Sequence, residues 1–205
     1  MHKKIDELVK KADVCINLVG ILFEKGANTF TNIHEKFPSM VASLCKKHKL
    51  NKFIHLSALG IEKAKDSKYA MSKLNGEMAI KKNFKESIIL KPSIIYSVDD
   101  KFTTMIMGLL NILPIFPLYY GGRTKFMPLH CVDMCNLIID LIENNTNDKI
   151  IECVGPDELT FKQIIEKLLK LVEKKRFFVP MPIYIANIMA TFFQLLPNPL
   201  ITRDQ

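Results

Sequence analysis

The chain has 205 residues, of which 48% are hydrophobic, 9% aromatic and 24% charged. This composition is typical of a folded protein and excludes large-scale disorder. The formal net charge of +8 comes almost wholly from lysines that are spread along the chain rather than massed beside aromatic residues, so nucleic-acid binding is not expected.

The cysteines stand in apolar stretches with no paired framework: Cys15, Cys45, Cys131, Cys135 and Cys153. This pattern indicates free thiols in a reducing compartment, either the bacterial cytoplasm or a matrix-like space. His130, Cys131 and Cys135 also allow the interpretation of a metal cluster, but no fourth ligand has a suitable spacing, so no metal is expected. Residues 1–12 predict a polar, lysine-rich helix and contain no signal peptide.

The next two elements predict the start of a parallel sheet. An unbroken apolar run over residues 13–20, DVCINLVG, indicates a strand that is buried on both faces. Asn17, Leu18 and Gly20 at its end would lie beside a ligand, with Gly20 allowing close approach of the backbone; the alternative is a plain strand terminus. Apolar residues at spacings of three and four over residues 30–48 predict an amphipathic helix, which tolerates Pro38 only in its first turn or at a kink.

The rest of the chain is organised around residues 52–77, KFIHLSALGIEKAKDSKYAMSKLNGE. They predict a buried strand that ends at Ser57, followed by a helix that carries Tyr69 and Lys73. Two residues four positions apart on a helix project from one face and can meet the same small molecule. The order strand, loop and helix places the strand end and the helix start at one edge of a parallel sheet.

These three side chains fit proton and hydride transfer. A tyrosine hydroxyl, with a reference pKa of about 10, needs a nearby cation to exchange protons at neutral pH, and Lys73 would supply it. Lys73 would also donate a hydrogen bond to a nucleotide ribose, while Ser57 would hold a substrate carbonyl or hydroxyl as hydride passes to or from nicotinamide. The alternative is that Tyr69 and Lys73 are only surface neighbours at helical spacing.

Residues 87–96, SIILKPSIIY, predict another buried strand, which is interrupted around Pro92 and Ser93 because proline cannot donate to the sheet. Alternation of strands with helices predicts a doubly wound α/β sheet that binds ligands at the carboxyl ends of its strands. A soft boundary separates a Rossmann-type nucleotide-binding part, residues 1–98, from a C-terminal substrate, lid and interaction part, residues 99–205.

The C-terminal part predicts a small α/β lid. Residues 102–120 are nearly uncharged, which would also suit a membrane span. Pro114 and Pro117 instead favour a helix that ends in a loop. Asp133 is expected to cap the next helix. Residues 150–154 predict a strand, and the pair at 160 and 163 predicts a capping box. The uncharged residues 177–201 hold about fifteen helical positions between prolines, too few for a span, and would cover a pocket or meet a membrane surface or partner.

Seven motifs together resemble one known family: INLVGILFEKG, KFIHLSALGIE, YAMSKLNGE, ILKPSIIYSVDDKF, FMPLHCVDM, VGPDELTF and LPNPLITRDQ. In this order they are similar to the atypical short-chain dehydrogenase/reductase group. Within it, the resemblance is strongest to the 39 kDa accessory subunit of respiratory complex I and its bacterial relatives, often labelled NAD-dependent epimerase/dehydratase.

The resemblance implies a Rossmann-type fold that binds NADP(H) or NAD(H). It places Asn17, Leu18 and Gly20 along the cofactor, Ser57 with Tyr69 and Lys73 at the family's catalytic positions, and Pro92 and Ser93 near the nicotinamide. Lys91 stands where many relatives have arginine. The family's opening Gly-x-x-Gly-x-x-Gly turn, which seats the pyrophosphate, is missing from the sequence. A partial sheet that lacks its first strands is therefore expected, in a chain truncated at both ends.

Three functional hypotheses follow from the sequence. The first is a nucleotide-binding, mainly structural protein, accessory to a respiratory membrane complex and peripheral to the inner membrane. The second is an active NAD(P)-dependent reductase or epimerase/dehydratase, because Ser57, Tyr69 and Lys73 are all present. The third is a non-functional remnant of a split gene, because the phosphate-binding turn is missing.

Overall fold

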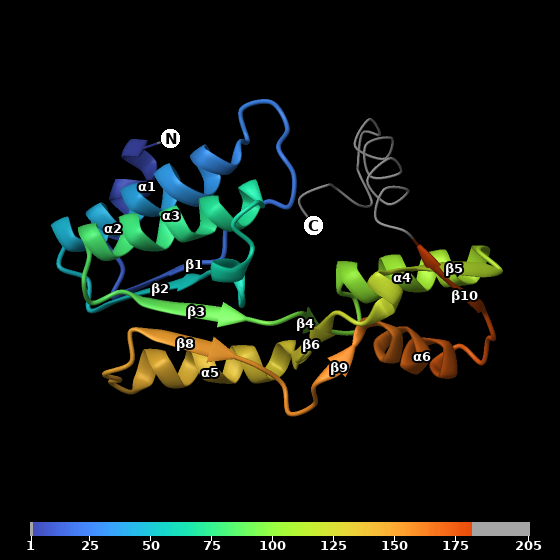
Figure 1. Cartoon of the computed structure of the whole chain (residues 1–205). Coiled ribbons are helices and arrows are strands. Elements are labelled where there is room, and N and C mark those ends of the chain that lie inside the picture. Colours follow the sequence, from blue (N-terminus) through green and yellow to red (C-terminus); the bar gives the residue numbers. More distant parts are fainter. Residues whose placement is uncertain (1, 182–205) are drawn as a thin grey trace. The chain divides into compact units, whose positions relative to one another are not determined.

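The computed structural model describes residues 2–181, which divide into two compact units (Figure 1). The first unit comprises residues 2–92 and Cys135–Cys153, and the second comprises residues 93–134 and 154–181. The expected proline-bracketed helix and the LPNPLITRDQ motif lie outside the described residues. The division of the chain after residue 98 stays a prediction.

A four-stranded sheet forms the centre of the first unit. Its strands are parallel and follow the order β1 (Val14–Asn17), β2 (Lys52–Leu56), β3 (Ile88–Pro92) and β8 (Ile150–Cys153). Every residue of β3 is buried, as expected for a strand between two covered faces. The predicted parallel α/β sheet is therefore confirmed.

Helices cover both faces of this sheet (Figure 1). One face carries, in chain order, α1 (His2–Val9), the π-helix η1 (Thr31–Lys36), α2 (Phe37–Lys47), the short 3-10 helix η2 (Ile61–Lys63) and α3 (Lys68–Asn83). The part of α5 (Cys131–Glu143) that belongs to this unit lies on the other face. Pro38 occupies the first turn of α2, which confirms the predicted position of the proline.

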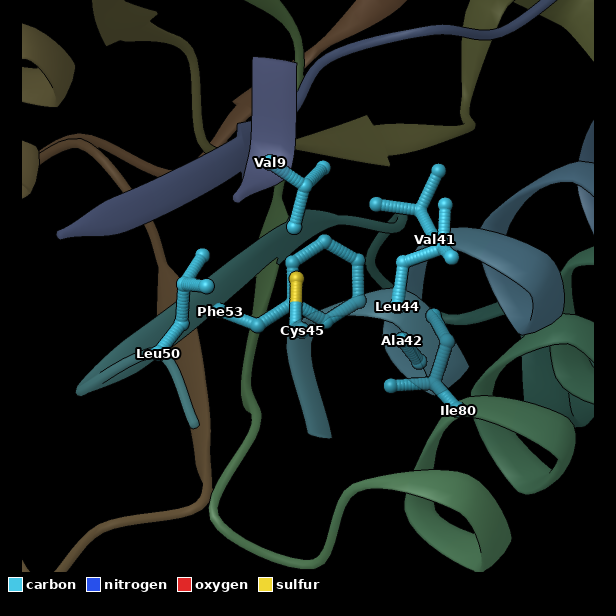
Figure 2. Close-up of a cluster of buried hydrophobic side chains, with 8 residues drawn as sticks. All are labelled: Val9, Val41, Ala42, Leu44, Cys45, Leu50, Phe53 and Ile80. Carbon is cyan, nitrogen blue, oxygen red and sulfur yellow. The ribbon is translucent and has the colours of Figure 1, made fainter. Parts of the chain in front are cut away.

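The main core of the first unit lies between the sheet and its helices, where buried side chains gather around the Phe53 ring (Figure 2). The cluster consists of Val9, Val41, Ala42, Leu44, Cys45, Leu50, Phe53 and Ile80. Each fully buried Phe, Leu or Ile contributes roughly 1.5–3 kcal/mol by leaving water. This core fixes α2 and α3 above β2, the strand that leads to Ser57.

The second unit is built from three short strand pairs and two helices. β4 (Ile95–Tyr96) pairs in parallel with β7 (Leu129–His130), and β5 (Ile115–Tyr119) in parallel with β10 (Phe177–Met181). β6 (Lys125–Phe126) is antiparallel to β9 (Leu159–Thr160). The helices are α4 (Lys101–Ile112) and α6 (Phe161–Leu171), and a 3-10 turn, η3 (Tyr120–Gly122), follows β5. Among the helices described, none is both long enough and apolar enough to cross a bilayer.

Two local features predicted for residues 87–181 are present, and a third is not. The capping box of Thr160 and Gln163 is present at the start of α6. The break in residues 87–96 is also present, because β3 ends at Pro92 and β4 begins at Ile95 in a different sheet. The loop expected after α4 is wrong, since residues 115–119 form strand β5.

The expected cap at Asp133 is wrong as well. α5 begins at Cys131, so Asp133 lies inside its first turn rather than at the cap position. His130 serves this helix end, because its Nδ1 accepts a hydrogen bond from the Val132 N–H at 3.2 Å. The Asp133 carboxylate still interacts favourably with the positive end of the helix dipole.

Helix α3 approaches η1 so closely that only glycine fits at the contact. A Cβ atom on Gly76 would lie 1.9 Å from the His34 carbonyl oxygen, which belongs to the backbone and has no side-chain freedom to move away. Gly76 therefore sets the distance between the helix that carries Tyr69 and Lys73 and the segment that carries His34.

We predict that Gly76→Ala destabilises the protein by about 1–3 kcal/mol or more, because the added methyl group forces the two helices apart. Gly108→Ala is the matched control, because Gly108 also lies inside a helix but a Cβ atom there would meet nothing within 4 Å. The control should gain up to about 1 kcal/mol from helix propensity. Thermal or urea unfolding measures both variants, and equal stability of the two would contradict the close contact.

Candidate functional site

Lys73 lies at the centre of the candidate site. Tyr69, Lys73 and Glu77 follow one another at intervals of four on α3 and therefore share one face of the helix. The Lys73 side chain is buried, and its Nζ donates a hydrogen bond to the carbonyl oxygen of Leu56, the last residue of β2, at 3.2 Å. Burial lowers the pKa of Lys73 to about 8, although the charge of Glu77 opposes this shift.

The Tyr69 ring lies beside this amine. Lys73 Nζ is 6.0 Å from the centroid of the ring, within the range of a cation–π interaction. The ring also makes edge-on contacts with the rings of Phe30 at 5.9 Å and His34 at 5.3 Å. Burial raises the pKa of the Tyr69 hydroxyl, so at neutral pH the side chain is a neutral phenol that can donate a proton.

Ser57 is the buried residue directly after β2, and its hydroxyl bonds to α3. Its Oγ donates a hydrogen bond to Glu77 Oε1 at 2.5 Å. Glu77 Oε2 in turn lies 3.2 Å from Lys91 Nζ, and Lys91 forms a second ion pair with Glu62. Although burial lowers the pKa of Lys91, hydrogen bonds to the two carboxylates raise it above its ordinary value.

The loop after β1 brings the predicted cofactor residues to Lys73. A Cβ atom on Gly20 would lie 3.4 Å from Lys73 Nζ, so the Gly20 backbone borders the amine directly. The buried Asn17 side chain is hydrogen-bonded through Nδ2 to His55 Nδ1 at 2.9 Å and accepts from the Val19 N–H through Oδ1. The Leu18 side chain is exposed.

His34 fixes this loop in place. The Ile21 N–H donates to His34 Nε2 at 3.1 Å, so the neutral ring carries its proton on Nδ1, which donates to Ser72 Oγ at 2.9 Å. Ser72 Oγ donates onward to the Tyr69 carbonyl oxygen at 2.7 Å. Burial, with a smaller contribution from the charge of Lys73, lowers the pKa of His34 to about 4. The loop is thus linked to α3 through an uncharged histidine.

The two remaining predicted residues follow each other at the end of β3. Pro92 is buried, and its carbonyl oxygen accepts a hydrogen bond from the Leu59 N–H at 2.9 Å, which ties β3 to the loop after Ser57. Ser93 belongs to the second unit, where its Oγ accepts a hydrogen bond from the Met127 N–H at 3.2 Å.

The sequence assigned no role in the site to five polar residues that surround it: His34, His55, Ser72, Glu77 and Lys91. One signal was available, because a lysine inside the apolar run SIILKPSIIY needs a buried counter-charge. A glutamate one turn after Lys73 was a candidate for that role. The histidines gave no such signal, since their positions also fit plain apolar periodicity.

The residues at Lys73 fit one end of a nicotinamide dinucleotide. The Lys73 ammonium is a donor for ribose hydroxyls, and the missing side chain at Gly20 leaves the backbone close to it. The Tyr69 hydroxyl adds a second polar group on the same helix face. Within residues 2–181, no group of three or more His, Cys, Asp or Glu is placed to hold a metal ion, and none of the cysteines described forms a disulfide.

No family model matches the chain, but individual known proteins do. It is 24% identical over 181 residues to the mitochondrial NADH-ubiquinone oxidoreductase 40 kDa subunit of Neurospora crassa, covering 88% of this chain and 47% of that one. It is also 24% identical over 203 residues to the mitochondrial NADH dehydrogenase (ubiquinone) 1 alpha subcomplex subunit 9 of Mus musculus, covering 98% of this chain and 54% of that one.

The chain is therefore similar along most of its length to these NADH dehydrogenase subunits. This result confirms the resemblance to the 39 kDa accessory subunit of complex I that the motifs indicated. The chain spans about half the length of the curated relatives it matches.

Solved structures identify the fold. UDP-glucuronic acid 4-epimerase from Bacillus cereus, in complex with UDP-glucuronic acid and NAD, has a TM-score of 0.72 at 22% identity, over 86% of this chain and 65% of that one. A dTDP-4-dehydrorhamnose reductase from Bacillus anthracis, in complex with NADP, has a TM-score of 0.74 at 13% identity, over 91% and 72%. The fold is therefore the partial Rossmann-type α/β fold that was predicted, and both of these solved proteins hold a nicotinamide dinucleotide.

We predict that stability falls as the pH drops from about 6.5 toward 4. Burial, with smaller effects from nearby charges, lowers the pKa of His34 to about 4 and of His55 to about 3, so the unfolded chain takes up protons first. Each histidine contributes a slope of up to about 1.4 kcal/mol per pH unit, with its full stabilisation present only above its unfolded pKa. Urea unfolding between pH 4.5 and 7.5 measures this slope. It should be smaller in His34→Gln, and an unchanged slope would contradict the buried neutral ring.

Proposed function

We propose that the chain is an NAD(P)-binding, short-chain dehydrogenase-like protein with a mainly structural, accessory role at a membrane-bound NADH dehydrogenase. The observation that carries the nucleotide-binding part is the buried Lys73 amine, which lies between the end of β2, the Tyr69 ring and the Gly20 backbone. The accessory part is supported by the homology to NADH dehydrogenase subunits. We place the protein at the matrix side of the inner membrane, while a bacterial cytoplasmic location stays a prediction.

Lys73 would bind the dinucleotide through its charge. Its pKa of about 8 keeps most of the amine protonated at pH 7, so it can donate to the ribose hydroxyls next to the nicotinamide. A bound dinucleotide would supply a hydride-carrying ring at this position. The loop of Asn17, Leu18 and Gly20, held by His34, would lie along the cofactor.

An active reductase or epimerase/dehydratase is the second candidate. Ser57, Tyr69 and Lys73 are all present, and the neutral Tyr69 phenol is in the form that donates a proton to a carbonyl. The bond from Ser57 to Glu77 favours the accessory role, because it engages the hydroxyl proton that a substrate carbonyl would require. The hypothesis of a non-functional remnant predicts that no dinucleotide binds at all.

A basic and apolar end of the second unit supports a peripheral membrane location. The Phe177 N–H donates to the Pro114 carbonyl, and Arg176 Nε donates to the Leu110 carbonyl, so the segments after α4 and α6 lie side by side.

Exposed apolar side chains flank these segments at Ile112, Ile115, Leu171 and Phe177. Lys170, Lys174, Lys175 and Arg176 stand among them. Cations interleaved with exposed apolar groups fit the surface of an anionic bilayer, which we propose as the occupant.

We predict that Lys73→Met weakens NADPH binding about 10- to 100-fold, because a charge-assisted hydrogen bond contributes about 1.5–3 kcal/mol. NADPH fluorescence titration of the purified chain measures the affinity. Lys82→Met is the matched control, because Lys82 is an exposed lysine in the last turn of the same helix and should leave the affinity unchanged.

The same titration separates the three hypotheses. Tyr69→Phe should keep its affinity for NADPH whether or not the protein is an enzyme, but it should abolish any turnover that the unchanged chain shows. Turnover that survives in Tyr69→Phe would remove the enzymatic hypothesis as stated, which assigns proton transfer to Tyr69. Absence of NADPH binding by the unchanged chain would remove the proposed function and leave the remnant.

We predict that the chain sediments with vesicles of phosphatidylcholine and cardiolipin, but not with vesicles of phosphatidylcholine alone. The variant Lys170→Glu/Lys175→Glu should lose most of this binding, at about 1 kcal/mol or more per charge reversed. Lys81→Glu/Lys82→Glu on α3 changes the net charge equally and is the control. Equal loss in both variants would show non-specific charge attraction and would contradict the proposed surface.

A further inference from the structure

A buried charged network joins β2, α3 and β3 next to the candidate site. Ser57 Oγ donates to Glu77 Oε1 at 2.5 Å, and Glu77 Oε2 lies 3.2 Å from Lys91 Nζ. These residues are only 5%, 6% and 6% exposed. Lys91 also pairs with Glu62, whose side chain is half exposed, so the network reaches from Ser57 to the surface.

Stability alone is a weak reason for this network. Removing two charges from water costs several kcal/mol for each ion, and a well-packed apolar pair of similar volume is often no less stable. The ion pair does have a geometric effect. Lys91 holds one carboxylate oxygen of Glu77 and thereby leaves the other oxygen pointing to Ser57.

The hydrogen-bond inventory then determines how Ser57 can meet a ligand. A serine hydroxyl has one proton to donate and lone pairs to accept with, whereas an ionised carboxylate only accepts. Because the Ser57 proton goes to Glu77, the oxygen offers only lone pairs to any other group. A partner of Ser57 must therefore be a donor, such as an alcohol hydroxyl or an amide N–H, and a carbonyl oxygen does not qualify.

We propose that Glu77, held by Lys91, is the positioning residue of the site and directs the Ser57 hydroxyl so that Ser57 accepts a hydrogen bond from the ligand. Of the two groups that the sequence allowed opposite Ser57, a carbonyl or a hydroxyl, this arrangement selects the hydroxyl. The inference rests on the proposed dinucleotide binding, because the nicotinamide end carries such donors in its carboxamide N–H and its ribose hydroxyls.

A double-mutant cycle on NADPH affinity tests whether Glu77 acts through Ser57. Ser57→Ala and Glu77→Gln should each weaken binding at least fivefold, because glutamine replaces one of the two carboxylate oxygens with an NH2 group, which cannot accept from Ser57 or Lys91. The affinity of the double variant for NADPH should be no lower than that of whichever single variant binds NADPH more weakly. A Glu77→Gln effect that persists at full size in the Ser57→Ala background would overturn the proposal, as would an effect on thermal stability alone.

Two control variants separate positioning from charge. Lys91→Arg keeps the cation beside Glu77 and should bind NADPH within twofold of the unchanged chain. Glu62→Gln removes the other carboxylate on Lys91 without contacting Ser57, and it should also stay within twofold. Glu77→Gln could fail to fold because it leaves Lys91 with a weaker partner. In that case the variant Glu77→Gln/Lys91→Met, which removes both charges, takes the place of Glu77→Gln in the cycle.

Failure of the proposed function would be distinguishable from failure of this inference. If the unchanged chain binds no NADPH, the proposed function is lost, and unfolding of the same four proteins without ligand decides the link between Ser57 and Glu77 on which the inference depends. Additive stability changes of Ser57→Ala and Glu77→Gln would then overturn the link between the two residues. Non-additive changes would support it.

Discussion

The first unit depends on one constraint, which is that the ammonium group of Lys73 on α3 is buried against the end of strand β2. A charged amine removed from water needs polar partners, and Lys73 finds them in the Leu56 carbonyl and the face of the Tyr69 ring. These contacts set the position of α3 along β2. One turn further, Glu77 reaches Ser57, so the same helix face makes a second polar contact with the same strand end.

The approach of α3 to η1 is constrained by the absence of a side chain. Gly76 lets the helix touch the His34 backbone, and His34 in turn holds the loop after β1 through its ring. The polar contacts of α3 with β2 and its close packing against η1 thus align three segments that are distant in sequence. The Gly20 backbone borders Lys73 because of this alignment.

Local patterns predicted much of this fold, and non-local contacts account for the rest. The parallel sheet, α2, α3, the break at Pro92 and the capping box of α6 all follow from periodicity or turn chemistry over a few residues. Strand β5 was missed because its pairing partner, β10, lies far along the chain, and because Pro114 before it and Pro117 within it indicated a loop. The start of α5 was misplaced because His130, an unusual cap, takes the role that was expected for Asp133.

In the candidate site, too, the local pattern could be predicted from the sequence and the non-local contacts could not. The residue types and spacing of Ser57, Tyr69 and Lys73 could be recognised from the sequence, because they lie within one strand–loop–helix segment. The partner of the Ser57 proton could not, since a glutamate on a helix is usually solvated and only the fold brings Glu77 to the strand end and Lys91 to Glu77.

Binding and turnover make different demands on these residues, and this difference supports the accessory role. In the proposed role, binding would use the charge of Lys73, whose lowered pKa of about 8 still leaves the amine mostly protonated at neutral pH. Turnover requires Tyr69 to give up its proton, which burial opposes by raising the pKa of the hydroxyl. It also requires a donor toward a substrate carbonyl, and Ser57 directs its only proton to Glu77. These contacts support the proposal that the site holds a dinucleotide without reducing a carbonyl.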